Sequence, residues 1–144
     1  MTDTPDWIGW TESFYTDVEA LSIDRVLDRF APGGELVFGN NPPAVGRVAI
    51  REALDGLRAA LAGIRHEWRN CWQVDDRGTV LLEARVHYIT RGGTELTLPC
   101  VTVIARAPSG AVTSLRIHLD TSPLFAALAA EAATAPEAAG GLAT

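Results

Sequence analysis

Four β-rich segments in the second half of the chain constrain its fold most. The joints between them are only three or four residues long, and each contains glycine. Such short joints return each strand beside the one before it, so each pair is predicted to form a β-hairpin. Three consecutive hairpins make a four-stranded antiparallel meander. The segments are 66–74, 79–90, 94–106 and 111–120.

The residues before the meander have helical periodicity. Thr4, Pro5 and Asp6 predict a helix start, because a hydroxyl cap, a proline in the first turn and an acid are typical there. Apolar residues then recur at helical spacing. The pattern predicts three helices and one short strand. The expected helices are 7–21, 22–30 and 47–64, and the expected strand is 35–38.

Helices segregated from strands predict an α+β domain rather than a doubly wound α/β fold. A long curled antiparallel sheet with the N-terminal helices in its concave face makes a cone, and a cone leaves a cavity at its open end. The 144 residues fit one domain. We expect that domain over residues 1–128, with a last helix starting near Ser122. The alanine- and glycine-rich residues 129–144 are expected to end in a flexible tail.

The charge and composition argue against several partners. The net charge of −6, without a basic run, gives no electrostatic reason to bind nucleic acid. The apolar stretches are shorter than the roughly 20 residues of a spanning helix, so no membrane is expected. The acidic N-terminus lacks the basic start of a signal peptide. Cys71 and Cys100 form no CxxC motif, and we expect reduced thiols in a cytoplasmic protein.

Two strands have one apolar face and one polar face. Strand periodicity puts alternate residues on opposite faces. In one interpretation the apolar face is the core and the polar face meets solvent. In the other, the polar face lines the cavity and the apolar face packs on the sheet of a second subunit; the four tryptophans and the mid-strand histidines favour this one. The ionisable residues of the polar faces are Glu83, Arg85, His87, Arg116, His118 and Asp120.

Several common site motifs are absent from the sequence. His66, His87 and His118 lack the spacing of metal ligands, and His66 is interpreted as an ordinary strand residue. No serine lies in a nucleophile elbow, and no glycine-rich loop precedes a helix as phosphate binding requires. We therefore expect neither a metal nor a cofactor.

The order of several weak motifs resembles the nuclear-transport-factor-2-like superfamily. The motifs are a helix–helix–strand start, Asn40-Asn41-Pro42-Pro43, Gly46-Arg47-x-x-Ile50-Arg51, and a last strand ending in Asp120 with Pro123 after it. The resemblance covers roughly residues 7–128. The most similar types are the SnoaL-like polyketide cyclases, the ketosteroid-isomerase-like proteins and the limonene-epoxide-hydrolase-like proteins. It implies a cone-shaped, cystatin-like α+β barrel with a deep pocket, a homodimer through the sheet, and chemistry without a metal.

The resemblance also implies site residues. A carboxylate corresponding to Asp120 moves a proton in SnoaL-like cyclases. In the epoxide hydrolases a strand arginine and aspartate join it: Arg85 fits the arginine, but His87 stands in place of the aspartate. Asn40 fits an asparagine of that type, whereas Phe38 replaces the tyrosine that helps hold the water. The two replacements argue against epoxide hydrolysis.

Asp120 and His87 together predict an acid/base pair. Such a pair abstracts a proton next to a carbonyl and returns it elsewhere, while Arg85 or Asn40 holds the oxyanion. We expect a cofactor-free isomerase, cyclase or lyase acting on a small apolar carbonyl compound. The residues expected to line its pocket are Tyr15, which matches the oxyanion tyrosine of the steroid isomerases, Phe38, Trp68, Trp72 and His118.

Two alternatives remain open from the sequence. The chain is a non-catalytic ligand-binding or dimerisation module if Asp120 only caps the helix that begins near Ser122. It is an epoxide hydrolase if the replacements at Phe38 and His87 are tolerated. The direction of the Asp120 carboxylate separates catalysis from capping.

Overall fold

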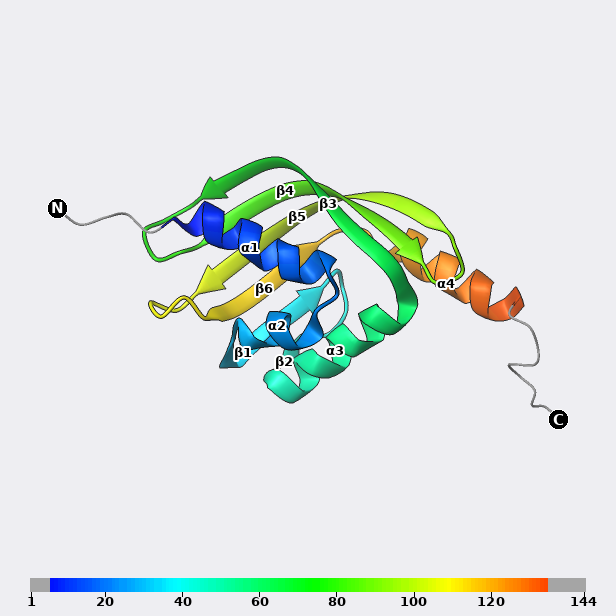
Figure 1. Cartoon of the computed structure of the whole chain (residues 1–144), viewed down its shortest axis with the longest axis horizontal. Coiled ribbons are helices and arrows are strands. Elements are labelled where there is room, and N and C mark those ends of the chain that lie inside the picture. Colours follow the sequence, from blue (N-terminus) through cyan, green and yellow to red (C-terminus); the bar gives the residue numbers. More distant parts are fainter. Residues whose placement is uncertain (1–5, 135–144) are drawn as a thin grey trace.

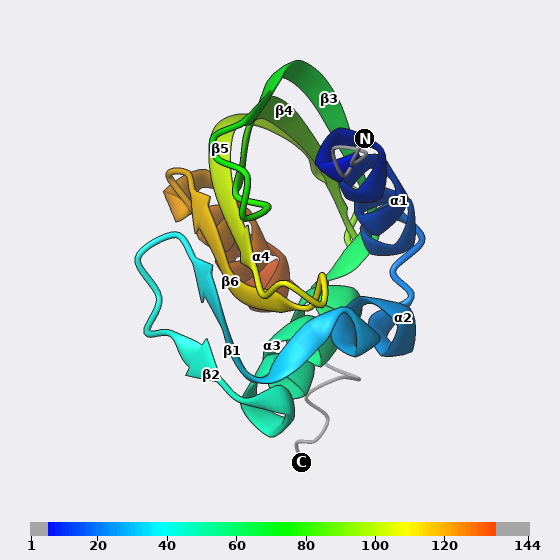
Figure 2. The ribbon, with the colours of Figure 1, turned by 90° about the vertical axis from the view of Figure 1, so that its left-hand side faces the viewer.

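A computed structural model describes residues 6–134 (Figures 1 and 2). This part of the chain forms four helices and six strands. The helices are α1 (Trp7–Glu19), α2 (Ile23–Asp28), α3 (Arg47–Ala60) and α4 (Ser122–Thr134). The strands are β1 (Phe30–Phe38), β2 (Ala44–Val45), β3 (Leu61–Gln73), β4 (Val80–Thr90), β5 (Glu95–Arg106) and β6 (Val112–His118).

The strands form one curved sheet in the order β2-β1-β6-β5-β4-β3. The predicted meander is present, because β3, β4, β5 and β6 pair antiparallel in sequence order. β1 then joins β6 in parallel and carries the short β2 at its other edge. Figure 2 shows the sheet curling without closing, with α1, α2 and α3 along the opening. The fold is thus the expected α+β arrangement of a curved sheet and N-terminal helices.

The helix ends differ from the predicted ranges. Asp6 caps α1 by accepting a hydrogen bond from the backbone N–H of Gly9 at 2.8 Å, whereas the predicted start at Thr4 and Pro5 lies outside the described residues. α3 ends at Ala60, because Leu61 is already extended and pairs with Thr90. The apolar spacing of 61–64 therefore belongs to a strand. α4 continues past the predicted boundary at 128 to Thr134; residues 135–144 are outside the described part.

Burial decides which face of β4 lies inside. Its even-numbered residues from Val80 to Thr90 are at most 3% exposed, while Arg85 and Ile89 on the other face are exposed. The interpretation with the polar face in the cavity is therefore wrong for this strand. The reason is physical: the helices can remove only one sheet face from water, and the face without charged groups is buried at the lowest cost.

The core consists of two adjoining clusters of apolar side chains. The first joins α1, α2 and α3 to the sheet through residues such as Phe14, Phe30 and Ile50, all fully buried. The second lies beside α4 and includes Leu61, Tyr88 and Leu124. The space between helices and sheet is where a pocket is found. Within residues 6–134, no helix is long and apolar enough to cross a membrane.

Candidate functional site

A pocket of about 270 Å³ lies inside the curve of the sheet. All four helices contribute to its walls, together with β1, β3, β4, β5 and β6. Its volume is close to the lower end of the roughly 300–1,000 Å³ that ligand pockets commonly have. The expected pocket is therefore present, and its size suits a molecule of one or two rings.

The walls of this pocket are mainly apolar. Leucine, isoleucine, valine and phenylalanine make up most of the lining, and among the described lining residues none is Asp, Glu, Lys or Arg. A charged ligand would lose its hydration without gaining a counter-ion, which is costly. The pocket therefore suits an uncharged molecule.

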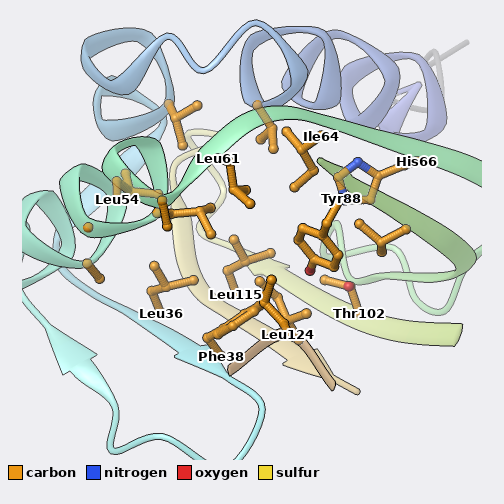
Figure 3. A pocket seen from close by; sticks show the side chains of 18 of the residues that line it. Leu36, Phe38, Leu54, Leu61, Ile64, His66, Tyr88, Thr102, Leu115 and Leu124 are labelled. Atoms are coloured by element: carbon orange, nitrogen blue, oxygen red, sulfur yellow. The ribbon is translucent and has the colours of Figure 1, made fainter. Parts of the chain in front are cut away.

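Four polar side chains gather at one end of the pocket. Tyr15 comes from α1, His66 from β3, Tyr88 from β4 and Thr102 from β5. Figure 3 shows His66, Tyr88 and Thr102 on the same side of the cavity, far from Leu36 and Leu54 at its other side. The rings of Tyr15 and His66 are in contact, with centroids 4.5 Å apart. These four residues are called the polar end below.

Glu19 holds His66 in place from outside the pocket lining. One carboxylate oxygen, Oε2, accepts the backbone N–H of His66 at 2.6 Å and lies 3.1 Å from the imidazole Nδ1. With Nδ1 protonated toward the carboxylate, Nε2 is the basic nitrogen, and the described residues give it no hydrogen-bond partner. Glu19 and His66 thus form an oriented carboxylate–imidazole pair at the polar end.

The pKa of Glu19 is below its usual value. Burial alone raises it, but the hydrogen bonds from the side chain and backbone of His66, with the charges of His66 and Arg65, outweigh this effect. The carboxylate is therefore ionised at neutral pH. An ionised Glu19 stabilises a positive charge on His66, as general-base chemistry requires.

The tyrosines of the polar end remain protonated donors. Burial raises the pKa of Tyr15 well above its ordinary value, although a hydrogen bond with Thr102 opposes this rise. Burial likewise raises the pKa of Tyr88. Thr102 is itself buried, and its Oγ1 lies 3.4 Å from the Sγ of Cys100. Neutral hydroxyls beside an imidazole can hold a carbonyl oxygen while the imidazole moves a proton.

Asp120 caps a helix and does not reach the pocket. Its Oδ1 accepts the backbone N–H of Ser122 at 3.0 Å and the Ser122 hydroxyl at 2.6 Å. These hydrogen bonds lower the pKa of the exposed carboxyl group, and the bond from the Ser122 hydroxyl has the larger effect. The geometry is the capping arrangement that the sequence left as an alternative, and it gives no support to Asp120 as the acid/base group.

His87 and Arg85 lie on the outer face of the sheet. The Nε2 of His87 is 3.0 Å from Glu67 Oε1, and its Nδ1 is 2.9 Å from Thr97 Oγ1. The predicted convergence of these residues with Asp120 is therefore not found. Their strand parity explains it, because Val86 between them is buried and faces inward.

The other predicted site residues divide into three groups. Tyr15 and Phe38 line the pocket. Trp68 instead packs beside it, edge to face with Tyr15 and with the ring centroids 6.1 Å apart. Three further residues are exposed and outside the lining, contrary to prediction. These are Asn40, Trp72 and His118.

Sequence reasoning missed Glu19, His66, Tyr88 and Thr102 as site residues, although signals existed. Glu19 is one helical turn after Tyr15 and shares its helix face. Tyr88 and Thr102 are hydroxyl residues on otherwise apolar strand faces. Such polar groups on a buried face need a partner or a ligand. No cluster of metal-binding side chains is present in residues 6–134.

Comparisons with known structures agree with this architecture. A polyketide cyclase, proposed as such, from Xanthomonas campestris pv. campestris has 18% identity and a TM-score of 0.70, over 85% of this chain and 96% of that one. An NTF2-like protein of unknown function from Burkholderia pseudomallei K96243 has 13% identity and a TM-score of 0.73, with the same coverage. SalBIII, an epoxide hydrolase/cyclase-like enzyme in pyran ring formation in the polyether salinomycin, has 16% identity and a TM-score of 0.71, again over 85% and 96%.

These likenesses show the nuclear-transport-factor-2-like fold that the sequence motifs predicted. No curated protein matches the sequence. The model of one family, described as the SnoaL-like domain, matches residues 11–114, which is most of the chain and includes the polar end of the pocket. The chain therefore belongs to the SnoaL-like domain family.

Proposed function

We propose that this protein binds a small, uncharged carbonyl compound in its pocket and moves a proton on it, as an isomerase, cyclase or lyase. One observation carries the proposal: His66, which lines the apolar pocket, is oriented by Glu19 through a 3.1 Å contact at Nδ1. An imidazole with one nitrogen fixed and the other free is suited to general acid/base catalysis.

The roles of the residues follow from this geometry. Nε2 of His66 takes a proton from the carbon next to the carbonyl, and the electron pair moves to the carbonyl oxygen. The hydroxyls of Tyr15, Tyr88 or Thr102 hold that oxygen by hydrogen bonds. The imidazolium, stabilised by Glu19, then returns its proton to another atom of the substrate or to a leaving group.

The family supports this class of reaction. SnoaL-like proteins include polyketide cyclases, and two of the similar structures are described with cyclase chemistry. Epoxide hydrolysis finds less support in the pocket, because no described lining residue carries a carboxylate.

A non-catalytic ligand-binding protein is the second candidate. The observation that favours it is Asp120, whose carboxylate caps α4 instead of entering the pocket. Under this proposal, the polar end only recognises the oxygen of a bound molecule, and no proton moves.

1-Tetralone provides a test of both proposals. Saturation-transfer NMR measures its binding, and deuterium incorporation next to the carbonyl in D₂O measures proton transfer. We expect the protein to accelerate incorporation and the His66→Gln variant to bind without acceleration. His87→Gln is the matched control, since this histidine lies on the outer face, and it should behave as the wild type.

The outcomes separate the candidates. Binding without acceleration by the wild type supports the binding protein and contradicts catalysis. Acceleration that survives His66→Gln contradicts the role of His66. Absence of binding contradicts both proposals for this ligand class.

A homodimer through the outer face of the sheet also remains a proposal. Exposed apolar side chains support it, since Trp72 is 46% exposed and Ile89 is 41% exposed on that face. Sedimentation at micromolar concentration tests it, and a monomer would contradict it.

A further inference from the structure

The pocket opens between α3 and α4. Of the described residues that line it, four are exposed to solvent: Asn41 after β1, Ala53 and Gly56 on α3, and Phe125 on α4. These four residues are called the mouth. The polar end is buried on the far side, so a ligand that enters here reaches His66 only after passing the apolar walls.

The two sides of the mouth differ in bulk. α3 presents the small residues Ala53, Gly56 and Ala60 along one helix stripe. At Gly56, an added Cβ would have no heavy atom within 4 Å, so this side is open. α4 presents Phe125, which is 43% exposed and meets Phe38 edge to face at 6.4 Å. The width of the mouth therefore depends on the position of α4.

α4 is attached by polar contacts at its two ends. At its start, Asp120 accepts hydrogen bonds from Ser122. Near its end, Oε2 of Glu131 accepts the hydroxyl of Thr90 at 2.6 Å and also that of Thr94. Figure 1 shows this end of α4 beside the turn that joins β4 and β5. Between the two attachments, the helix meets the pocket only through apolar side chains.

Of the two attachments of α4, the contact of Glu131 is the easier one to break. The chain continues directly from β6 into the start of α4, so that end cannot move far. The other end is held to the hairpin through the Glu131 side chain, and the other described residues after Leu128, up to Thr134, are alanine and threonine with little to pack. Breaking this contact would let α4 pivot about its start and carry Leu128, a lining residue one turn before Glu131, away from the pocket.

We propose that α4 is the gate of the pocket and that Glu131, bound to Thr90 and Thr94, is its latch. The ligand enters between α3 and α4 when the latch is released, and the mouth admits flat, uncharged ring compounds. This inference rests on the proposed small-molecule binding, but not on catalysis. A gate limits association and dissociation equally, because the same opening serves both.

Stopped-flow fluorescence with 1-naphthol tests the latch. We expect Glu131→Ala to raise the association and dissociation rate constants together, by about tenfold as expected for lost charge-assisted hydrogen bonds, with the Kd within twofold of the wild type. Glu52→Ala is the control, since this exposed glutamate lies on α3 outside the pocket lining. Unchanged rate constants, or a faster dissociation alone, would overturn the gate.

Narrowing the mouth gives an independent test. Gly56→Trp should lower the association rate constant at least tenfold, because it adds an indole at an exposed lining position where an added Cβ meets no atom within 4 Å. Gly33→Trp is the matched control: this glycine also has no atom within 4 Å of an added Cβ, but it lies on β1 outside the pocket lining. If the two variants change the association rate constant equally, or if neither changes it, the proposed entrance between α3 and α4 is contradicted.

The result also separates the gate from the proposed function. If 1-naphthol does not bind the wild type, pocket binding fails and the gate fails with it. If 1-naphthol binds but the Glu131 and Gly56 variants keep wild-type rate constants, the gate alone is overturned. If both variants behave as expected while 1-tetralone shows no proton transfer, the gate stands and catalysis fails.

Discussion

Replacing Glu19 with alanine should lower the free energy of unfolding by about 2 kcal/mol. The carboxylate accepts two hydrogen bonds from His66, one from the backbone N–H at 2.6 Å and one at Nδ1 at 3.1 Å. The Glu19 side chain is 32% exposed. Solvent screening therefore reduces each charge-assisted bond, which we take as about 1 kcal/mol. In a domain of this size, about 2 kcal/mol corresponds to a fall in Tm of roughly 4–8 °C.

A double-mutant cycle separates the two contributions. Glu19→Ala, His66→Ala and the double variant are unfolded in urea, with circular dichroism as the signal. The backbone N–H is present in every variant, so the coupling energy reports the imidazole contact alone and should be about 1 kcal/mol. The rest of the loss in Glu19→Ala belongs to the unpaired backbone N–H.

The pH dependence of this loss has a definite sign. The pKa of Glu19 in the folded protein lies below 4.5, its value in the unfolded chain. Its stabilising contribution is therefore complete above pH 4.5 and is lost as the pH falls through the folded pKa. The difference in stability between wild type and Glu19→Ala should shrink in acid.

Two results would refute the reasoning. One is a loss below about 0.5 kcal/mol, the usual range for surface substitutions, with no coupling to His66. The other is a difference that grows as the pH falls, since the contact would then be formed by the protonated carboxyl group.

Four further variants test the fold and the site. Asp120→Asn should leave the exchange of 1-tetralone unchanged, because the side chain caps α4 outside the pocket; lost exchange would contradict this assignment. Gly56→Ala should stabilise the protein to urea by about 0.5–1 kcal/mol, since alanine favours the helix and its Cβ meets no atom within 4 Å; a lower midpoint would contradict it. Leu82→Ala should cost about 2–5 kcal/mol, because Leu82 is 1% exposed, and the outward Arg85→Ala less than about 0.5 kcal/mol; equal costs in urea unfolding would mean that the faces of β4 are reversed.

Local chemistry in the sequence was enough for the main helices, the meander and the fold class, but it missed β2 and the start of β1 at Phe30. The glycine-containing joints fixed the hairpins, because so few residues can connect only antiparallel neighbours. Helical periodicity in the first half, and its absence in the second, separated helices from strands. The ends were less certain. The spacing of three between the apolar residues Leu61 and Ile64 is typical of a helix. Pairing with β4 makes this segment a strand, and the register irregularity between Leu61 and Gly63 explains why both side chains are buried.

The tertiary structure decided which side chains form the site. Strand periodicity defines two faces but does not say which one the helices cover, so the polar face of β4 was available as a pocket lining until packing placed Val86 and Tyr88 inside. The pair of Glu19 and His66 joins residues 47 positions apart. No local pattern contains such a contact, since it forms only when α1 lies across β3.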